Sequence, residues 1–102
     1  MASSFKRYTS SSVGTGATTI YTVPSSTEAI MMGCNIANIT ASQISVDVQV
    51  ANVYLVKGAP IPANSALSVL DGKINLEVSD TVIVTSNTAS STDVILSVFE
   101  KA

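Results

Sequence analysis

The residue types that most often carry out chemistry in proteins are rare in this sequence. It has no histidine, no tryptophan and one cysteine, Cys34, although serine and threonine are abundant. A hydroxyl needs a neighbouring base to become a nucleophile, and a zinc site needs several Cys or His ligands. We therefore expect neither a serine–histidine–aspartate triad nor an ordinary zinc centre.

The seven carboxylates are the remaining candidates for catalysis or metal binding. An acid–base pair or a calcium site could use their oxygens. However, Asp47 falls on the polar face of a predicted strand, and Asp71, Asp80 and Asp93 fall at turns or strand ends, where solvated carboxylates are common. The spacing of Asp71, Glu77 and Asp80 matches no known calcium loop. We predict a protein that is not an enzyme and that has no metal or other cofactor.

Three tyrosines leave one binding function open. Tyr8, Tyr21 and Tyr54 could line a carbohydrate site, because aromatic faces stack on sugar rings. Tyrosines in half-buried strands also serve as packing groups. A carbohydrate-binding module is therefore an alternative function.

The composition indicates a protein that associates with other proteins. Only 12% of the residues are charged, the net charge is −2, and five Lys and Arg residues are too few for a nucleic-acid surface. No apolar run approaches the roughly 20 residues that span a membrane. The first 16 residues lack the cationic and apolar regions of a secretory signal, so we expect the protein to stay in the cytoplasm where it is made. A surface poor in charge favours contact with copies of itself or with a partner.

The elements that must carry these residues are strands. Apolar residues alternate with polar ones at Ile44, Val46, Val48 and Val50, and again at Val94, Leu96 and Val98, which predicts half-buried antiparallel strands. The same alternation around Cys34 predicts a buried thiol. We expect strands at residues 18–23, 29–37, 43–50, 53–56, 66–70, 73–78, 81–85 and 93–99. No segment has convincing helical periodicity.

The connections between these strands also have characteristic residues. Ala51 and Asn52 indicate a bulge, a sharp bend or a short loop. Residues 57–62 should form a connection rather than a central strand, because Pro60 and Pro62 lack amide donors. Asp71 and Gly72 predict a tight hairpin. The fold class is all-β: an antiparallel, jelly-roll-like β-sandwich of seven or eight strands, formed by residues 17–102 as a single domain.

Residues 1–16 are predicted to be a flexible N-terminal arm, because they are mostly Ser, Thr and Gly. Within the arm, residues 5–8 (Phe-Lys-Arg-Tyr) form an island of larger side chains. They could form a short first strand at a sheet edge, or they could dock on a neighbouring subunit. Lys57, Lys73 and the two prolines could block another edge against unwanted pairing.

Several segments together resemble the small β-sandwich virion proteins of tailed bacteriophages, with marine cyanophages as the nearest likeness. The resemblance rests on residues 53–67 and 70–73, on 19–25 and 76–81, and on the final strand, and it covers about residues 17–100. Asn64 stands where the family pattern suggests glycine, and Asn also tolerates positive φ. The motifs indicate a sandwich rather than an activity.

The resemblance implies a capsid decoration or cement protein on the outer surface of the phage head, assembled in the host cytoplasm. Its partners would be the major capsid protein and copies of itself, as a homo-oligomer for which the resemblance suggests a trimer, without nucleic acid, membrane or small-molecule substrate. A neck or tail adaptor of the same virion is the alternative. The candidate partner-binding residues are Phe5, Lys6, Arg7, Tyr8, Pro60, Ile61, Pro62 and Asn64.

Overall fold

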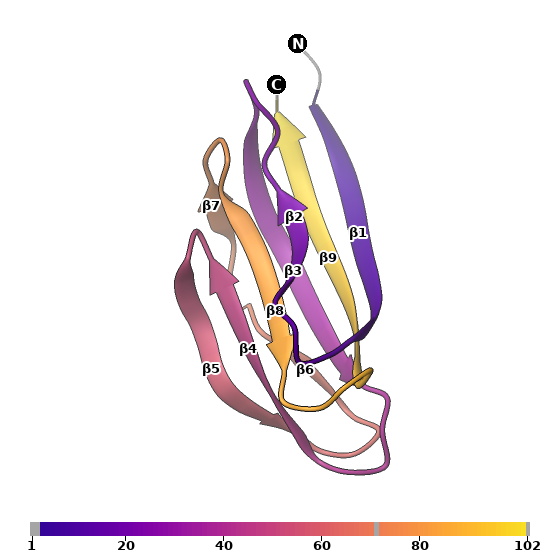
Figure 1. Ribbon diagram of the computed structural model, residues 1–102. Coiled ribbons are helices and arrows are strands. Elements are labelled where there is room, and N and C mark those ends of the chain that lie inside the picture. Colours follow the sequence, from indigo (N-terminus) through magenta and orange to yellow (C-terminus); the bar gives the residue numbers. More distant parts are fainter. Residues whose placement is uncertain (1–2, 71, 102) are drawn as a thin grey trace.

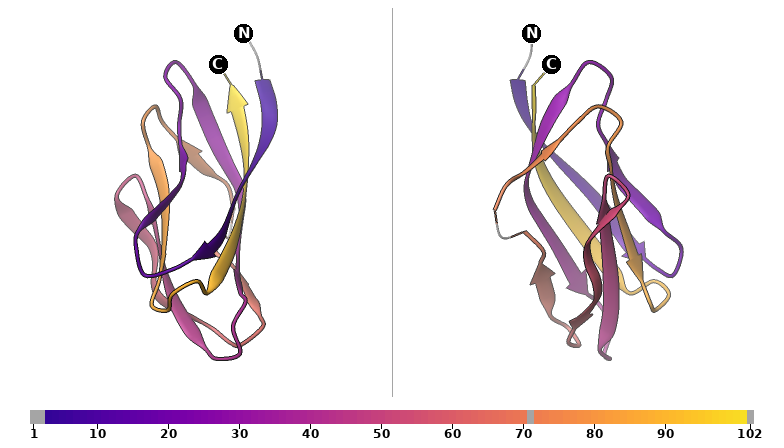
Figure 2. Two further views of the ribbon diagram at one scale, coloured as in Figure 1. Left: turned by 45° about the vertical axis from the view of Figure 1, so that its right-hand side comes forward. Right: turned by 90° about the vertical axis from the view of Figure 1, so that its left-hand side faces the viewer.

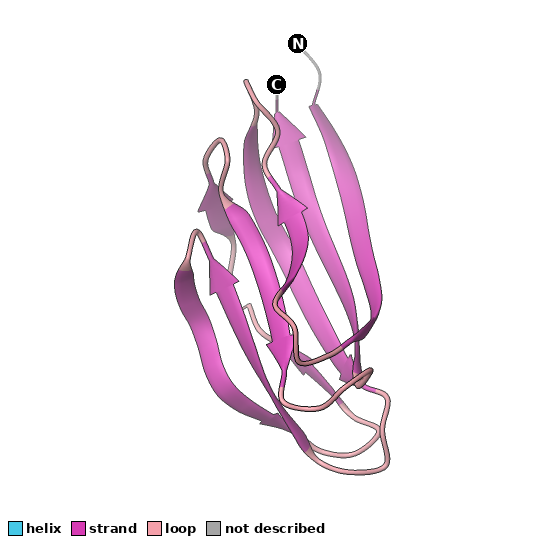
Figure 3. Cartoon of the chain, viewed as in Figure 1, coloured by secondary structure: helices cyan, strands magenta, loops and turns pink. Residues whose placement is uncertain are grey.

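The computed structural model describes residues 3–70 and 72–101, which form two antiparallel sheets packed face to face (Figures 1 and 3). The described residues contain nine strands and no helix. The strands are β1 (Ser3–Val13), β2 (Thr18–Thr22), β3 (Glu28–Asn38), β4 (Ile44–Val50), β5 (Val53–Ile61), β6 (Ala66–Ser68), β7 (Ile74–Leu76), β8 (Thr81–Ser86) and β9 (Thr92–Lys101). The predicted all-β sandwich is confirmed.

The strand order is that of a jelly roll. One sheet has the order β1-β9-β3, with β6 and β7 both paired to the far side of β3, and the other has the order β2-β8-β4-β5. Among the described strands, β4 and β5 are consecutive and paired in the same sheet. Six connections between strands in this part of the chain pass between the sheets, namely β1–β2, β2–β3, β3–β4, β5–β6, β7–β8 and β8–β9. This repeated crossing wraps the chain around one core (Figure 2).

The core is formed by the inward side chains of both sheets. On β9, Val94, Leu96 and Val98 are buried while Ile95 and Ser97 are exposed, and Ile44, Val46 and Val48 are buried on β4. The predicted alternation is therefore correct for both strands. Cys34 is also buried, as predicted, and burial raises the pKa of its thiol to about 11.

The N-terminal segment differs from the predicted flexible arm. Residues 3–13 form β1, an edge strand that pairs with β9 from Ser3 opposite Lys101 to Val13 opposite Thr92. A serine-rich strand can form here because β9 supplies its backbone hydrogen-bond partners. Only two apolar side chains of β1, Tyr8 and Val13, pack against the core, so the strand needs few apolar residues. Of the two interpretations of residues 5–8, an edge strand is the one that the structure has, and it is longer than expected.

Two predicted connections are wrong. The segment expected to be a connection at 57–62 extends β5 as far as Ile61, with Pro60 opposite Ser45. Proline is tolerated here because β5 is an edge strand. The predicted hairpin at Asp71 and Gly72 does not form, because β6 and β7 pair with β3 at different levels and not with each other; Asp71 itself lies outside the described residues.

The connection between β4 and β5 is a two-residue hairpin turn. Val50 faces Val53, and the two residues between them both have positive φ, 51° at Ala51 and 65° at Asn52. This is the backbone of a type I′ turn, in which Asn-Gly is preferred. The Cβ atom of alanine makes this left-handed backbone conformation unfavourable at Ala51, whereas glycine, which has no Cβ, adopts it without strain.

We predict that Ala51→Gly stabilises the protein by roughly 0.5–1 kcal/mol, because removing left-handed strain outweighs the entropy cost of glycine. The free energy of unfolding in urea measures this change. Ala66→Gly, at an exposed position in β6, is the matched control and should destabilise. Equal destabilisation by both substitutions would contradict the turn assignment.

Candidate interaction surfaces

The pairing of β1 with β9 divides the predicted Phe5–Tyr8 group between two faces. Phe5 lies opposite Phe99 and Arg7 opposite Ser97, on the outer face of the five-stranded sheet. Lys6 lies opposite Val98 and Tyr8 opposite Leu96, on the side that faces the core. Because side chains alternate along a strand, the four residues cannot form one binding surface.

The inward pair contacts a buried carboxylate, Glu100 on β9. Its Oε2 accepts hydrogen bonds from the hydroxyls of Tyr21 on β2, at 2.5 Å, and Tyr8 on β1, at 3.0 Å. Lys6 Nζ lies 3.7 Å from Oε1, and the tyrosine rings pack with their centroids 4.6 Å apart. This Glu100 cluster (Glu100, Tyr8, Tyr21 and Lys6) joins strands of both sheets.

The contacts in the Glu100 cluster stabilise the charged carboxylate. The hydrogen bond from Tyr21 is the main cause of a lowered pKa at Glu100, with further lowering by Tyr8 and Lys6 against the opposing effect of burial. Burial and the adjacent carboxylate raise the pKa of Tyr8 and of Tyr21. The cluster therefore has a structural role in holding the sheets together. Sequence reasoning missed Glu100, although it continues the inward period of Val94, Leu96 and Val98.

The outward residues contribute to an apolar surface that we call the outer-face patch: Phe5, Phe99, Ile30 and Met32. Phe5 pairs with Phe99 and Phe99 with Ile30 across β1, β9 and β3. The two phenylalanine rings are tilted, with centroids 4.9 Å apart, and Phe5 is 74% exposed. Lys73 lines a shallow depression together with the four patch residues.

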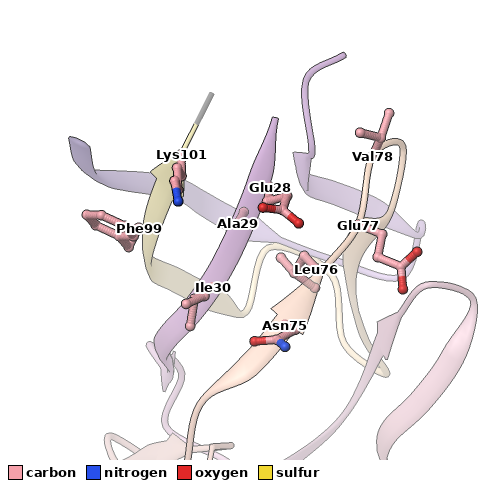
Figure 4. A pocket seen from close by; sticks show the side chains of 9 residues that line it. All are labelled: Glu28, Ala29, Ile30, Asn75, Leu76, Glu77, Val78, Phe99 and Lys101. Carbon is pink, nitrogen blue, oxygen red and sulfur yellow. The ribbon is translucent and has the colours of Figure 1, made fainter. Parts of the chain in front are cut away.

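A second depression, of about 480 Å³, continues from the patch toward β7. Ile30 and Phe99 border both depressions, and Figure 4 shows them on neighbouring strands with Leu76 beyond. Glu28 faces Lys101 across β3 and β9 at this end of the sheet. The second depression is lined by Glu28, Ala29, Ile30, Asn75, Leu76, Glu77, Val78, Phe99 and Lys101.

The second predicted group, at the end of β5, is only partly on the surface. Pro60, Pro62 and Asn64 are exposed, but Ile61 is fully buried in the core. Ile61 therefore offers no side chain to a partner in this structure, because its side chain fills the space between the sheets. Asn64 has a positive φ of 56°. This agrees with the expectation that Asn64 tolerates positive φ at a position where the phage proteins suggest glycine.

The buried side chain of Asn38 fixes this loop. Its amide donates to the carbonyl oxygens of Ser42, Ile61 and Pro62, at 2.8, 3.0 and 3.1 Å. The backbone N–H of Asn38 also donates to Ser65. Three carbonyl acceptors on one amide hold the loop in a single arrangement.

The two predicted groups lie at opposite ends of the sandwich. Phe5 is level with Phe99 on β9, whereas the Pro60–Asn64 loop is anchored to Asn38, which is level with Thr92. Seven residues along an extended strand span roughly 23 Å. The structure therefore has two separate candidate surfaces.

The described residues contain no group of three or more His, Cys, Asp and Glu side chains that could hold a metal ion. Nor does this part of the chain include a helix that is long and apolar enough to cross a membrane.

The topology defines the protein as a jelly-roll β-sandwich, a class found in viral capsids and in lectins. No known family model and no curated protein matches the sequence. Among solved structures, the fold is similar to a chain in "Acidic stable capsid structure of Helicobacter pylori bacteriophage KHP30". The match has a TM-score of 0.61 at 12% identity and covers 98% of this chain and 87% of that chain. The shared fold thus extends over nearly the whole of both chains.

We predict that Tyr21→Phe destabilises the protein by about 1–3 kcal/mol, because it removes a donor from a buried carboxylate. Tyr54→Phe is the matched control, since Tyr54 is 48% exposed on β5, and it should change stability by less than about 0.5 kcal/mol. Urea unfolding at neutral pH measures both. The same stability for the two variants would show that the Glu100 cluster contributes nothing.

The lowered pKa of Glu100 predicts a pH dependence. A carboxyl with a lower pKa in the folded state contributes stability that is fully present above its ordinary value of 4.5 and is lost as the pH falls through the folded value. Glu100→Gln should therefore be less stable than the natural protein at pH 7, and the difference should shrink toward pH 3. Glu77→Gln, at an exposed position, controls for the loss of one charge. A constant difference for Glu100→Gln from pH 7 to 3 would contradict the pKa shift.

Proposed function

We propose that this protein is a non-enzymatic phage virion protein that binds the outer surface of the head and stabilises the shell, as a capsid decoration or cement protein. The observation that carries the proposal is the fold shared over 98% of this chain with a chain of a phage capsid structure. The sequence resemblance to phage sandwich proteins supports the same function. Its partners would be the major capsid protein and further copies of itself, with a trimer as the proposed oligomer.

The surface composition supports a protein that works by association. Only 12% of the residues are charged, and several large apolar side chains are exposed, namely Phe5, Met32, Ile39, Val53, Tyr54, Val78 and Ile95. Exposed apolar groups gain free energy when a partner covers them. In a symmetric shell each modest contact is repeated at many equivalent positions, so small gains add up over the particle.

The carbohydrate-binding alternative finds less support in the structure. Tyr8 and Tyr21 stack on each other and donate to Glu100. Lys57 Nζ lies 4.7 Å from the centre of the Tyr54 ring. The three rings that could have stacked on sugars are therefore engaged by the protein itself.

A neck or tail adaptor would use the same fold, and copy number distinguishes it from a decoration protein. We predict a copy number proportional to that of the coat protein, because each head position would bind one oligomer. Quantitative mass spectrometry of purified particles, with isotope-labelled peptides of both proteins as standards, measures this ratio. About six to twenty copies per particle would contradict the decoration function and favour the adaptor.

A further inference from the structure

We infer that the outer-face patch is the surface that meets the shell, and that its occupant is a coat-protein segment with an apolar side chain between carboxylates. This inference rests on the proposed function and specifies the docking face and the chemistry of the partner. It is carried by an exposed apolar surface, by the rigidity of the strands under that surface, and by the distribution of basic residues around it.

The patch includes two of the large apolar side chains that are exposed among the described residues. Phe5 is 74% exposed and Met32 40% exposed, and both lie beside Ile30 and Phe99. Aromatic residues gathered at one place are typical of the central contacts of protein interfaces. A partner side chain seated in the depression would cover all four.

The strands that carry the patch are rigid in the absence of a partner. The patch residues lie on β1, β9 and β3, which are neighbouring hydrogen-bonded strands of one sheet, with a register shift at Met32 in the pairing of β3 with β9. The inward neighbours of Phe5 on β1 and Phe99 on β9, Lys6 and Glu100, contact each other beneath the sheet. A surface on paired strands loses little conformational freedom on binding, which favours affinity.

Three of the five Lys and Arg residues lie at or near this patch on the outer face: Arg7 on β1, Lys73 just before β7 and Lys101 at the end of β9. Lys6 lies on the inward side of β1, where Glu100 pairs with it, and Lys57 lies on β5 in the other sheet. Arg7 borders the patch on the β1 side and Lys73 on the β7 side. Lys101 faces Glu28, which offsets its charge.

This charge arrangement distinguishes between possible occupants. A two-fold axis would place the same patch of a second copy against this one. Arg7 and Lys73 would then lie close to Arg7 or Lys73 of that copy, and these like charges repel. A segment with carboxylates on both sides of an apolar anchor would instead pair with both cations. Because the chain as a whole carries a net charge of −2, the patch is the region where an acidic partner would be attracted.

The test is binding of purified protein to capsid shells that lack it, made from the phage that encodes it. Phe5→Ser, Arg7→Glu and Lys73→Glu should each weaken binding by at least about tenfold. Val53→Ser and Lys57→Glu make the matched changes on β5, in the other sheet, and should bind within about twofold of the natural protein. Thermal unfolding verifies that each variant is folded, and Arg7→Glu keeps the test valid if Phe5→Ser does not fold.

The outcomes separate this inference from the proposed function. If the natural protein fails to bind the shells, the decoration function is overturned. If it binds but the three patch variants bind equally well, the function stands and the docking face is wrong. If the patch variants instead abolish self-association and leave shell binding unchanged, a second copy is the occupant and the acidic coat segment is excluded.

Discussion

The buried carboxylate of Glu100 is the constraint on which the arrangement of this end of the sandwich depends. A charged group away from water is costly unless hydrogen bonds compensate for its lost hydration. The compensating groups come from β1 (Tyr8 and Lys6) and from β2 (Tyr21). These donors fix the register of β1, because a shift by one residue would turn Tyr8 and Lys6 outward and Phe5 and Arg7 inward. The exposure of Phe5 on the outer face is thus tied to the burial of Glu100.

A second constraint is the register shift in β3, which determines the β3 side of the outer-face patch. The register of β3 against β9 passes from Met31 opposite Val98 to Gly33 opposite Ser97, so Met32 is an extra residue in β3. On the opposite edge of β3, the pairing with β6 ends at Asn35 and the pairing with β7 begins at Met31. The extra residue and the break in the edge strand therefore lie at one level. Together they expose Met32 and place Lys73 beside it.

Sequence periodicity predicted the fold where one side of a strand is buried. The alternation on β4 and β9 and the turn residues between strands were enough to indicate an antiparallel sandwich, which the structure confirms. Periodicity failed for β1, because its serine-rich sequence contributes little to the core and its partner, β9, is the last strand of the chain. It also failed at Gly72, where a strong local turn signal was overridden by the pairing of both flanking segments with β3.

The candidate surfaces were less predictable than the fold. Phe5 and Arg7 were singled out because they form an island in a polar segment, but their neighbours on the patch, Ile30 and Phe99, come from distant strands. No local pattern reveals that these residues share a face, since the cross-strand register decides it. Ile61 was grouped with Pro60 and Pro62 by sequence proximity, whereas strand alternation buries it.

A cryo-electron microscopy map of decorated heads, at a resolution that shows side chains, would identify the docking face directly. If the outer face of the five-stranded sheet is the docking face, Phe5, Ile30 and Phe99 will lie against the coat protein, with coat carboxylates beside Arg7 and Lys73. The four-stranded sheet, which includes β4 and β5, would then lie on the side away from the shell. A map in which Val53 and Tyr54 of β5 lie on the coat protein, with Phe5 facing solvent, would show that the other sheet is the docking face.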